Sequence, residues 1–338
     1  MTLFFKSFLK TGLRLCLLLL SSWATLAIYY SNLPASLRPW VAGMFTAANL
    51  LALFGKYSSK WMRLGSLTAF CLVLFWWLLI PPSNNRDWQS DLATLAWAEM
   101  NGDTITLHNI RNCDYRTETD FTVRYYDKTF ELAKLKNVDF FVVYWGSPKI
   151  AHTMMSFEFE GQGSVCFSIE TRKEKGEDYS TIKGFFRQYE IIYVVADERD
   201  LVRLRTNYRK KGKGEDVYLY RLRASRQDIG RKVFLSYLDQ LNRLKEQPQW
   251  YNALTGNCTT SIRRHTAPYT GNNSLDWRLI VNGYIDEMLY ERKAIDTSLP
   301  FAELKKRSYL NPKAQAADKD LAFSQAIRVR ISRSELSP

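Results

Sequence analysis

The stretch 251–265, YNALTGNCTTSIRRH, places a cysteine where a helix is expected to begin. Gly256 allows a tight turn, and Asn257 or Thr255 can cap a helix whose first residue is Cys258. Backbone N–H groups at a helix N-terminus stabilise a thiolate and the oxyanion of a tetrahedral intermediate. The pattern therefore suggests a nucleophilic cysteine. The alternative is a small apolar side chain buried on the first helical turn.

Acyl transfer by a thiol also needs a base that accepts and returns a proton, and the chain has three histidines. His265 lies two turns after Cys258, about 10 Å along the same helix, which is too far for a hydrogen bond. His108 lies on an early predicted strand, far from Cys258 in the sequence. His152, in IAHTMMSFEF, is therefore the candidate base.

A predicted hairpin gives His152 a carboxylate neighbour. If AHTMMSFEF pairs antiparallel with GSVCFSIETR around residues 160–162, His152 lies opposite Glu170 on one face. A carboxylate in that position orients an imidazole, as the third member of a catalytic triad does. A register slip of one or two residues would bring in Ser168 or Arg172 instead. The alternative interpretation is a structural ion pair between Glu170 and Arg172.

The cysteines divide by location. Cys16 and Cys71 lie inside apolar segments, and Cys113, Cys166 and Cys258 lie outside them. In an oxidising compartment Cys113 and Cys166 can pair, which would leave Cys258 as an odd and reactive thiol. The alternative is that Cys113 and Cys166 are both core residues.

The N-terminal region predicts a membrane anchor. The first 81 residues contain seven of the 47 Lys and Arg and none of the 34 Asp and Glu. Residues 15–37, 39–55 and 64–85 are uncharged, and Arg38 separates the first two of these segments. About 20 apolar residues cross a bilayer as a helix, so three transmembrane helices are expected. Basic residues precede the first of these helices and lie in the loop between the second and the third, which predicts that both regions are cytoplasmic. The chain after the third helix is then expected in the periplasm, on the outer side of a bacterial inner membrane. The alternative for the first segment is a cleaved signal peptide.

The rest of the chain predicts one α+β domain, an antiparallel sheet with packed helices. Five β-branched or aromatic runs precede a helix at 225–247 in which Ser225 and Asp228 form a capping box, and a second helix starts at Cys258. The expected organisation is an anchor at 1–86, a catalytic domain at 87–311 and a polar tail at 312–338. The domain is only mildly basic, so no nucleic-acid partner is expected. No metal-ligand spacing or phosphate-binding glycine loop is present, so no metal, nucleotide or other cofactor is expected.

The segments RNCDYRTETDFTVRYYDKTFELAKLKNVDFFVVYW, IAHTMMSFEF, FSIETRKEKGEDYSTIKGFFRQYEIIYVVADERDLVRLRTN, EDVYLYRLRAS and YNALTGNCTTSI together resemble a bacterial membrane-protein family. This is the family built on the Lnb-type N-terminal periplasmic domain, which takes its name from a lipoprotein N-acyltransferase. That domain is similar to circularly permuted papain-like thiol enzymes, in which a histidine on a strand precedes an Asn-Cys helix start. The resemblance implies Cys258 as nucleophile and His152 as base.

Three functions are consistent with these residues. The first is a cysteine acyltransferase that takes an acyl chain from a membrane phospholipid and passes it to a lipid or lipoprotein amine. The second is a cysteine peptidase or amidase of cell-wall peptides, which predicts an open polar groove. The third is a non-catalytic, membrane-tethered binding module. The acyl donor, the acceptor and the oligomeric state stay open.

Further site residues are predicted around Cys258 and His152. They are Glu170 to orient the base, Asn257 as a side-chain amide or helix cap, the Thr259 N–H as a donor to the oxyanion, and Tyr251 and Arg172 as residues that line the site.

Overall fold

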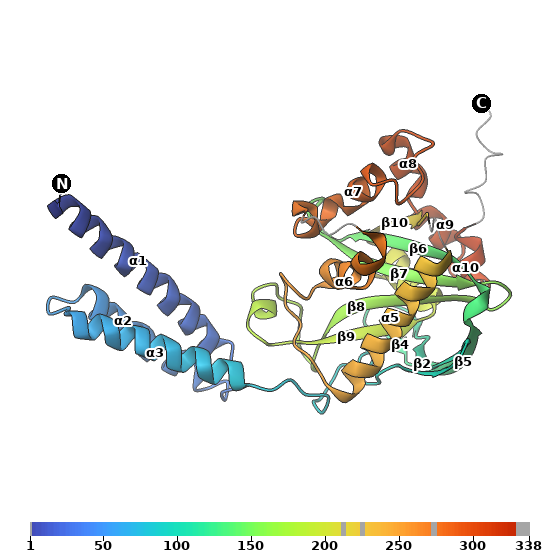
Figure 1. Ribbon diagram of the computed structural model, residues 1–338. Helices are drawn as coiled ribbons and strands as arrows, with labels where there is room; N and C mark the ends of the chain where they lie inside the picture. Colours follow the sequence, from blue (N-terminus) through green and yellow to red (C-terminus); the bar gives the residue numbers. More distant parts are fainter. Residues whose placement is uncertain (1, 211–213, 224–226, 272–275, 329–338) are drawn as a thin grey trace. The chain divides into compact units, whose positions relative to one another are not determined.

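The computed structural model describes residues 2–210, 214–223, 227–271 and 276–328 (Figure 1). The chain divides into two compact units. The first is Met1–Ser83 with Tyr179–Glu190, and the second is Asn84–Asp178 with Ile191–Pro338.

The first unit contains three helices that pack on one another, α1 (Thr2–Tyr29), α2 (Arg38–Phe54) and α3 (Lys60–Leu79). By length and composition, Thr11–Tyr29 and Lys60–Leu79 can cross a membrane. The helix α2 has 17 residues and is shorter than a typical span. Two polar pairs join α1 to α2, Ser21 with Asn49 at 3.1 Å and Thr25 with Thr46 at 2.9 Å. Such pairs between apolar helices favour a defined packing.

The second unit is built on an eight-stranded sheet in the order β1-β2-β9-β8-β7-β6-β10, with β5 paired to β2. The strands are β1 (Trp97–Asn101), β2 (Thr104–Arg111), β5 (Tyr125–Glu131), β6 (Leu135–Tyr144), β7 (Ala151–Phe159), β8 (Gly163–Arg172), β9 (Glu190–Ala196) and β10 (Asp216–Arg221). A separate two-stranded ribbon joins β3 (Asp114–Tyr115) and β4 (Phe121–Thr122). The sheet is mixed, whereas the sequence predicted an antiparallel one, because β9 joins β2 in parallel.

Helices cover both faces of this sheet. They are α4 (Glu198–Arg203), which continues into a π-helical turn η3 (Leu204–Tyr208), then α5 (Gln227–Glu246), α6 (Cys258–Thr270), α7 (Ile285–Glu291), α8 (Phe301–Ser308), α9 (Asn311–Ala316) and α10 (Phe323–Ala326). In Figure 1, α5 and α6 lie across the strands β7 to β9. Ser225, the predicted cap of α5, lies outside the described residues.

Alternation along β7 assigns the two faces. Phe157 points toward α5, where its ring lies 5.0 Å from that of Phe234. Met154 belongs to the other face, in a core cluster with Leu201 and Val202 of α4. Because side chains alternate along a strand, each further residue of β7 can be assigned to a face by its position.

The C-terminal region differs from the predicted polar tail. Leu310, Ala314, Ala317, Phe323 and Ile327 are buried in the same core cluster as α4. These apolar residues lie on and around α9 and α10, so the helices contribute to the core. The folded domain therefore extends at least to residue 327.

Candidate functional site

Cys258 is the first residue of α6, and a capping box fixes that start. The Asn257 side-chain oxygen accepts from the Thr260 N–H at 2.9 Å, and the Thr260 hydroxyl accepts from the Asn257 N–H at 3.0 Å. The Asn257 amide also donates to the Ala253 carbonyl at 2.9 Å. The prediction that Asn257 caps the helix is confirmed, and its side-chain amide is committed to the turn. The helix continues through Pro268 and ends at Gly271, whose φ is +67°.

Buried hydrogen bonds tie the N-terminus of α6 to β7. Asn282 donates to the Thr259 hydroxyl at 2.8 Å and accepts from the Ala151 N–H at 2.9 Å. The Thr259 hydroxyl also lies 3.3 Å from that of Thr153. Asn282 belongs to the short helix η5 (Asn282–Tyr284). Three elements distant in sequence therefore fix the position of Cys258.

Cys258 itself is buried, with 7% of its surface exposed. Its sulfur lies 3.8 Å from the Thr259 hydroxyl. Tyr251, in the loop before α6, is buried to a similar extent. The thiol thus lies in a protected setting at the end of a helix, where unpaired backbone N–H groups are available to an anion.

His152 lies in a hydrogen-bonded chain that ends on a carboxylate. Its Nε2 is 2.7 Å from the Ser168 hydroxyl, and Ser168 donates to Glu170 at 2.6 Å. Since Ser168 uses its proton toward Glu170, the hydrogen of the imidazole is assigned to Nε2, and Nδ1 carries the lone pair. The predicted register is confirmed, because Met154 pairs with Ser168, which places 152 opposite 170. Ser168 stands between the imidazole and the carboxylate.

Charges around this chain favour a neutral imidazole and an ionised carboxylate. Burial, and after it the positive charge of Arg205, lower the pKa of His152 to about 3. Burial raises the pKa of Glu170, but Arg205, which donates to Glu170 at 2.7 Å, outweighs that effect together with Arg209 and the other positive charges nearby, so the pKa of Glu170 lies well below its ordinary value. Arg205 comes from the π-helical turn η3 and also faces Glu215 at 3.5 Å. Glu170 therefore pairs with Arg205, a partner that the sequence did not suggest.

The structure does not bring His152 and Cys258 together. Thr153 contacts α6, whereas the neighbouring His152 points to the face of β7 that also carries Met154. Both residues lie in the part of the chain that the structure describes, and no hydrogen bond joins the thiol to the imidazole there.

Arg172 contacts the segment that precedes β1. It donates to the carbonyls of Leu92 at 2.9 Å and Ala93 at 2.7 Å, and its guanidinium stacks on Trp88 at 4.3 Å. Its contacts hold the segment before β1 against the sheet.

The other histidines and cysteines have structural surroundings. His108 lies 2.7 Å from Asp127 and stacks on Trp97. His265 lies 2.8 Å from both the Tyr193 and Ser236 hydroxyls, and burial lowers its pKa to about 4. Cys113 and Cys166 are free thiols in two separate core clusters, so the alternative that both are core residues is confirmed.

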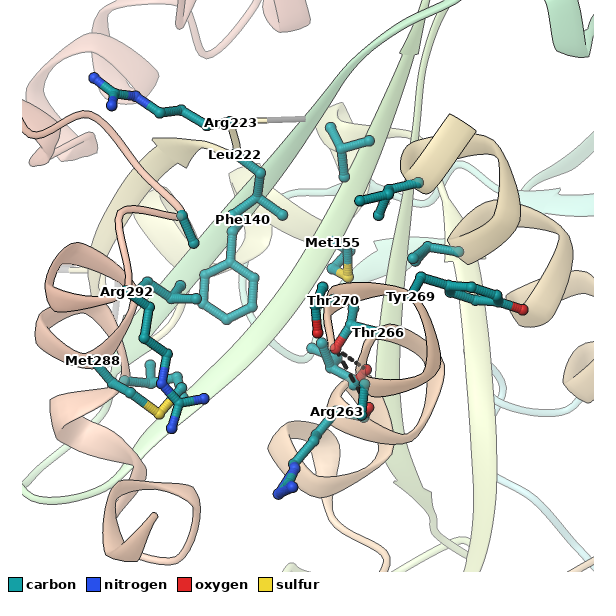
Figure 2. A pocket seen from close by; sticks show the side chains of 18 of the residues that line it. Phe140, Met155, Leu222, Arg223, Arg263, Thr266, Tyr269, Thr270, Met288 and Arg292 are labelled. Atoms are coloured by element: carbon teal, nitrogen blue, oxygen red, sulfur yellow. Dashed lines mark hydrogen bonds between the residues drawn. The ribbon is translucent and has the colours of Figure 1, made fainter. Parts of the chain in front are cut away.

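A cavity of about 510 Å³ lies between α6 and α7 and is lined by residues of both helices. Figure 2 shows Phe140 and Met155 of the sheet between α6, which carries Arg263 and Thr266, and α7 with the nearby Arg292. Most of the lining is apolar, and Thr259, adjacent to Cys258, borders it. The four charged side chains that line it are all basic: Arg223, Arg263, Arg292 and Lys293.

Two of these cations are paired and two are not. Arg223 lies 3.0 Å from Asp296, and Arg292 lies 3.2 Å from Asp276. Within the described residues, Arg263 and Lys293 have no hydrogen-bond or ion-pair partner for their side chains, and the lining includes no acidic residue. The cavity therefore combines an apolar wall with positive charge available to an anion.

Sequence reasoning missed Asn282, Arg205 and the cavity cations. The sequence predicts Ser168 as a neighbour of His152 only if the hairpin register slips. Asn282 lies in a turn-like Asn-Gly pair that carries no signal of contact with α6. Arg205 lies in a basic stretch that reads as a solvated loop, although its side chain is buried.

The chain thus combines two helices that are long and apolar enough to cross a membrane with an α+β domain that holds a buried cysteine at a capped helix start. Residues 121–283, about half of the chain, match the family model of the Lnb N-terminal periplasmic domain. This part of the chain belongs to that family, and it includes His152 and Cys258. The family and the two apolar helices fit a membrane protein with a periplasmic domain. No curated protein and no solved structure matches the chain.

Replacing Asn282 with Ala is expected to lower the free energy of unfolding by about 2 kcal/mol or more, because it leaves the buried Ala151 N–H without its acceptor and removes a donor to Thr259. Denaturant unfolding of wild type and variant measures this. The matched control is Asn137→Ala, which removes only a half-buried contact with Glu158. Equal stability of the two variants would contradict the anchoring role of Asn282.

His265 is expected to make the domain acid-sensitive. Its folded-state pKa of about 4 lies below the ordinary value of 6.5, so only the unfolded chain binds its proton between these pH values. The stability linked to His265 is complete above about pH 6.5 and is lost as pH falls toward 4. In His265→Gln, the slope of unfolding free energy against pH in this window should fall by up to about 1.4 kcal/mol per pH unit. Urea titrations at several pH values check this, and an unchanged slope would refute it.

Proposed function

We propose that this protein is a membrane-anchored, periplasm-facing cysteine acyltransferase that acts on lipid or lipoprotein, with Cys258 as the nucleophile. The family and the apolar helices support the location. The observation that carries the choice of substrate is the apolar, cation-lined cavity beside α6. An acyl chain with an anionic head group matches both its wall and its charge.

The proposed reaction has two steps. The Cys258 sulfur attacks the carbonyl carbon of an acyl ester, a C–S bond forms, the C–O bond breaks, and the alcohol leaves with a proton. An amine nitrogen then attacks the thioester carbon, the C–N bond of an amide forms, the C–S bond breaks, and the proton lost by the nitrogen passes through the base to the sulfur, which leaves as a thiol. Backbone N–H groups at the start of α6, including that of Thr259, are the proposed donors to the oxyanion in both steps.

His152 is the proposed base on the strength of the family resemblance. With a pKa of about 3 the imidazole is neutral but weakly basic in this conformation, whereas a general base works best with a pKa near the operating pH. Direct proton transfer needs the thiol and the imidazole within about 3.2 Å. In this proposal the end of β7 or the start of α6 therefore moves when substrate binds, and the chain through Ser168 and Glu170 orients the imidazole.

The cavity also bears on the alternatives. A cell-wall hydrolase would be expected to present an open polar groove, whereas this cavity is mainly apolar. A binding module that holds lipid without chemistry is distinguished by experiment, because it needs the cavity and not the thiol.

Intact mass spectrometry after incubation with bacterial phospholipids tests the proposal. The wild type should gain the mass of an acyl chain, neutral hydroxylamine should remove it, and Cys258→Ala should never gain it. Cys113→Ala is the matched control, since it removes another buried thiol and should keep the adduct. If His152 is the base, His152→Ala should form the adduct about 10²-fold or more slowly. No adduct on wild type, or an adduct that persists in Cys258→Ala, would refute the proposed enzyme.

A further inference from the structure

The segment Tyr179–Glu190 interrupts the second unit in sequence but belongs to the first unit by its contacts. It contains a short 3-10 turn, η2 (Lys183–Phe185), between β8 and β9. Its ring contacts include Phe186, which lies 5.7 Å from Tyr30 and 6.1 Å from Trp23 of α1. The segment Tyr179–Glu190 therefore packs on the apolar helices.

The segment binds the C-terminal ends of two helices. Arg187 donates to the carbonyls of Trp77 at 3.0 Å and Leu78 at 2.9 Å, and its guanidinium stacks on the Trp77 ring at 4.2 Å. Gln188 donates to the Tyr30 carbonyl, directly after α1, at 2.7 Å. The last carbonyls of a helix lack intrahelical donors and carry partial negative charge, so a guanidinium satisfies them well.

These contacts fix the height of the segment relative to a bilayer. The ends of α1 and α3 are where the two apolar helices leave the hydrocarbon region, since their lengths match its thickness. Trp77, Tyr29 and Tyr30 lie at these ends, as aromatic residues do at membrane interfaces. Tyr179–Glu190 therefore lies at the level of the lipid head groups.

The segment exposes apolar side chains at this level. The exposed fractions are 53% for Ile182, 40% for Phe185 and 37% for Tyr179. Residues three apart align along a 3-10 turn, so Ile182 and Phe185 share one side. Lys183 lies between them, and a lysine can bury its stem at an interface while its ammonium stays among head groups.

We infer that Tyr179–Glu190 is a membrane-interface segment that inserts Ile182 and Phe185 into the boundary between head groups and acyl chains of the periplasmic leaflet. The occupant of this surface is lipid, because the surface is continuous with helices that are themselves long and apolar enough to span the bilayer. The assignment of this surface does not depend on the proposed enzymatic activity.

Depth-dependent quenching tests the inference on the full chain. The five cysteines are replaced by alanine, and Ile182→Cys carries an environment-sensitive fluorophore in vesicles of phosphatidylethanolamine and phosphatidylglycerol. Phe185→Cys is a second labelling site. Leu321→Cys, in the second unit and 87% exposed, is the matched control. Circular dichroism establishes that each labelled protein is folded.

Labels at 182 and 185 should emit at shorter wavelength than the label at 321, and lipids with a nitroxide near the head group should quench them several-fold more strongly. Quenching at 182 and 185 no stronger than at 321 would overturn the inference. Shielding of 182 from aqueous quenchers without quenching by the lipids would indicate a second copy of the chain as the occupant, and it would also overturn the lipid assignment.

Discussion

The candidate site depends on the hydrogen bonds that hold the start of α6 against β7. Asn282 joins the Thr259 hydroxyl to the backbone of Ala151, and Thr153 completes the contact from the strand. These groups are buried, so each loses more by being unpaired than a surface group would. The direction of α6, the position of Cys258 and the wall of the cavity that α6 forms all follow from this attachment.

The same strand separates two kinds of environment. One face of β7 meets α6 and the cavity, whose lining is mainly apolar and whose charged side chains are all basic. The other face carries His152, Ser168 and the ionised Glu170, whose charge is balanced by the buried Arg205. The family resemblance assigns one reaction to residues from both faces. Movement at this end of the sheet is therefore the physical requirement of the proposed mechanism.

Local patterns predicted much of this arrangement. The cap before Cys258, the hairpin register at His152 and the helix α5 each depend on residues close in sequence, and all three are present. The parallel pairing of β9, the role of Asn282 and the burial of Arg205 depend on contacts between distant segments, which no local pattern contains. The C-terminal helices were mistaken for a tail because their apolar residues are few and widely spaced.

The most direct test of the account is photo-crosslinking with a phospholipid that carries a diazirine on its acyl chain, followed by peptide mass spectrometry. The account predicts crosslinks to α6 and α7 around the cavity, and a several-fold loss in Arg263→Glu. Arg264→Glu is the matched control, because Arg264 is exposed and does not line the cavity. Crosslinks confined to α1 and α3, or an equal loss in both variants, would contradict the account.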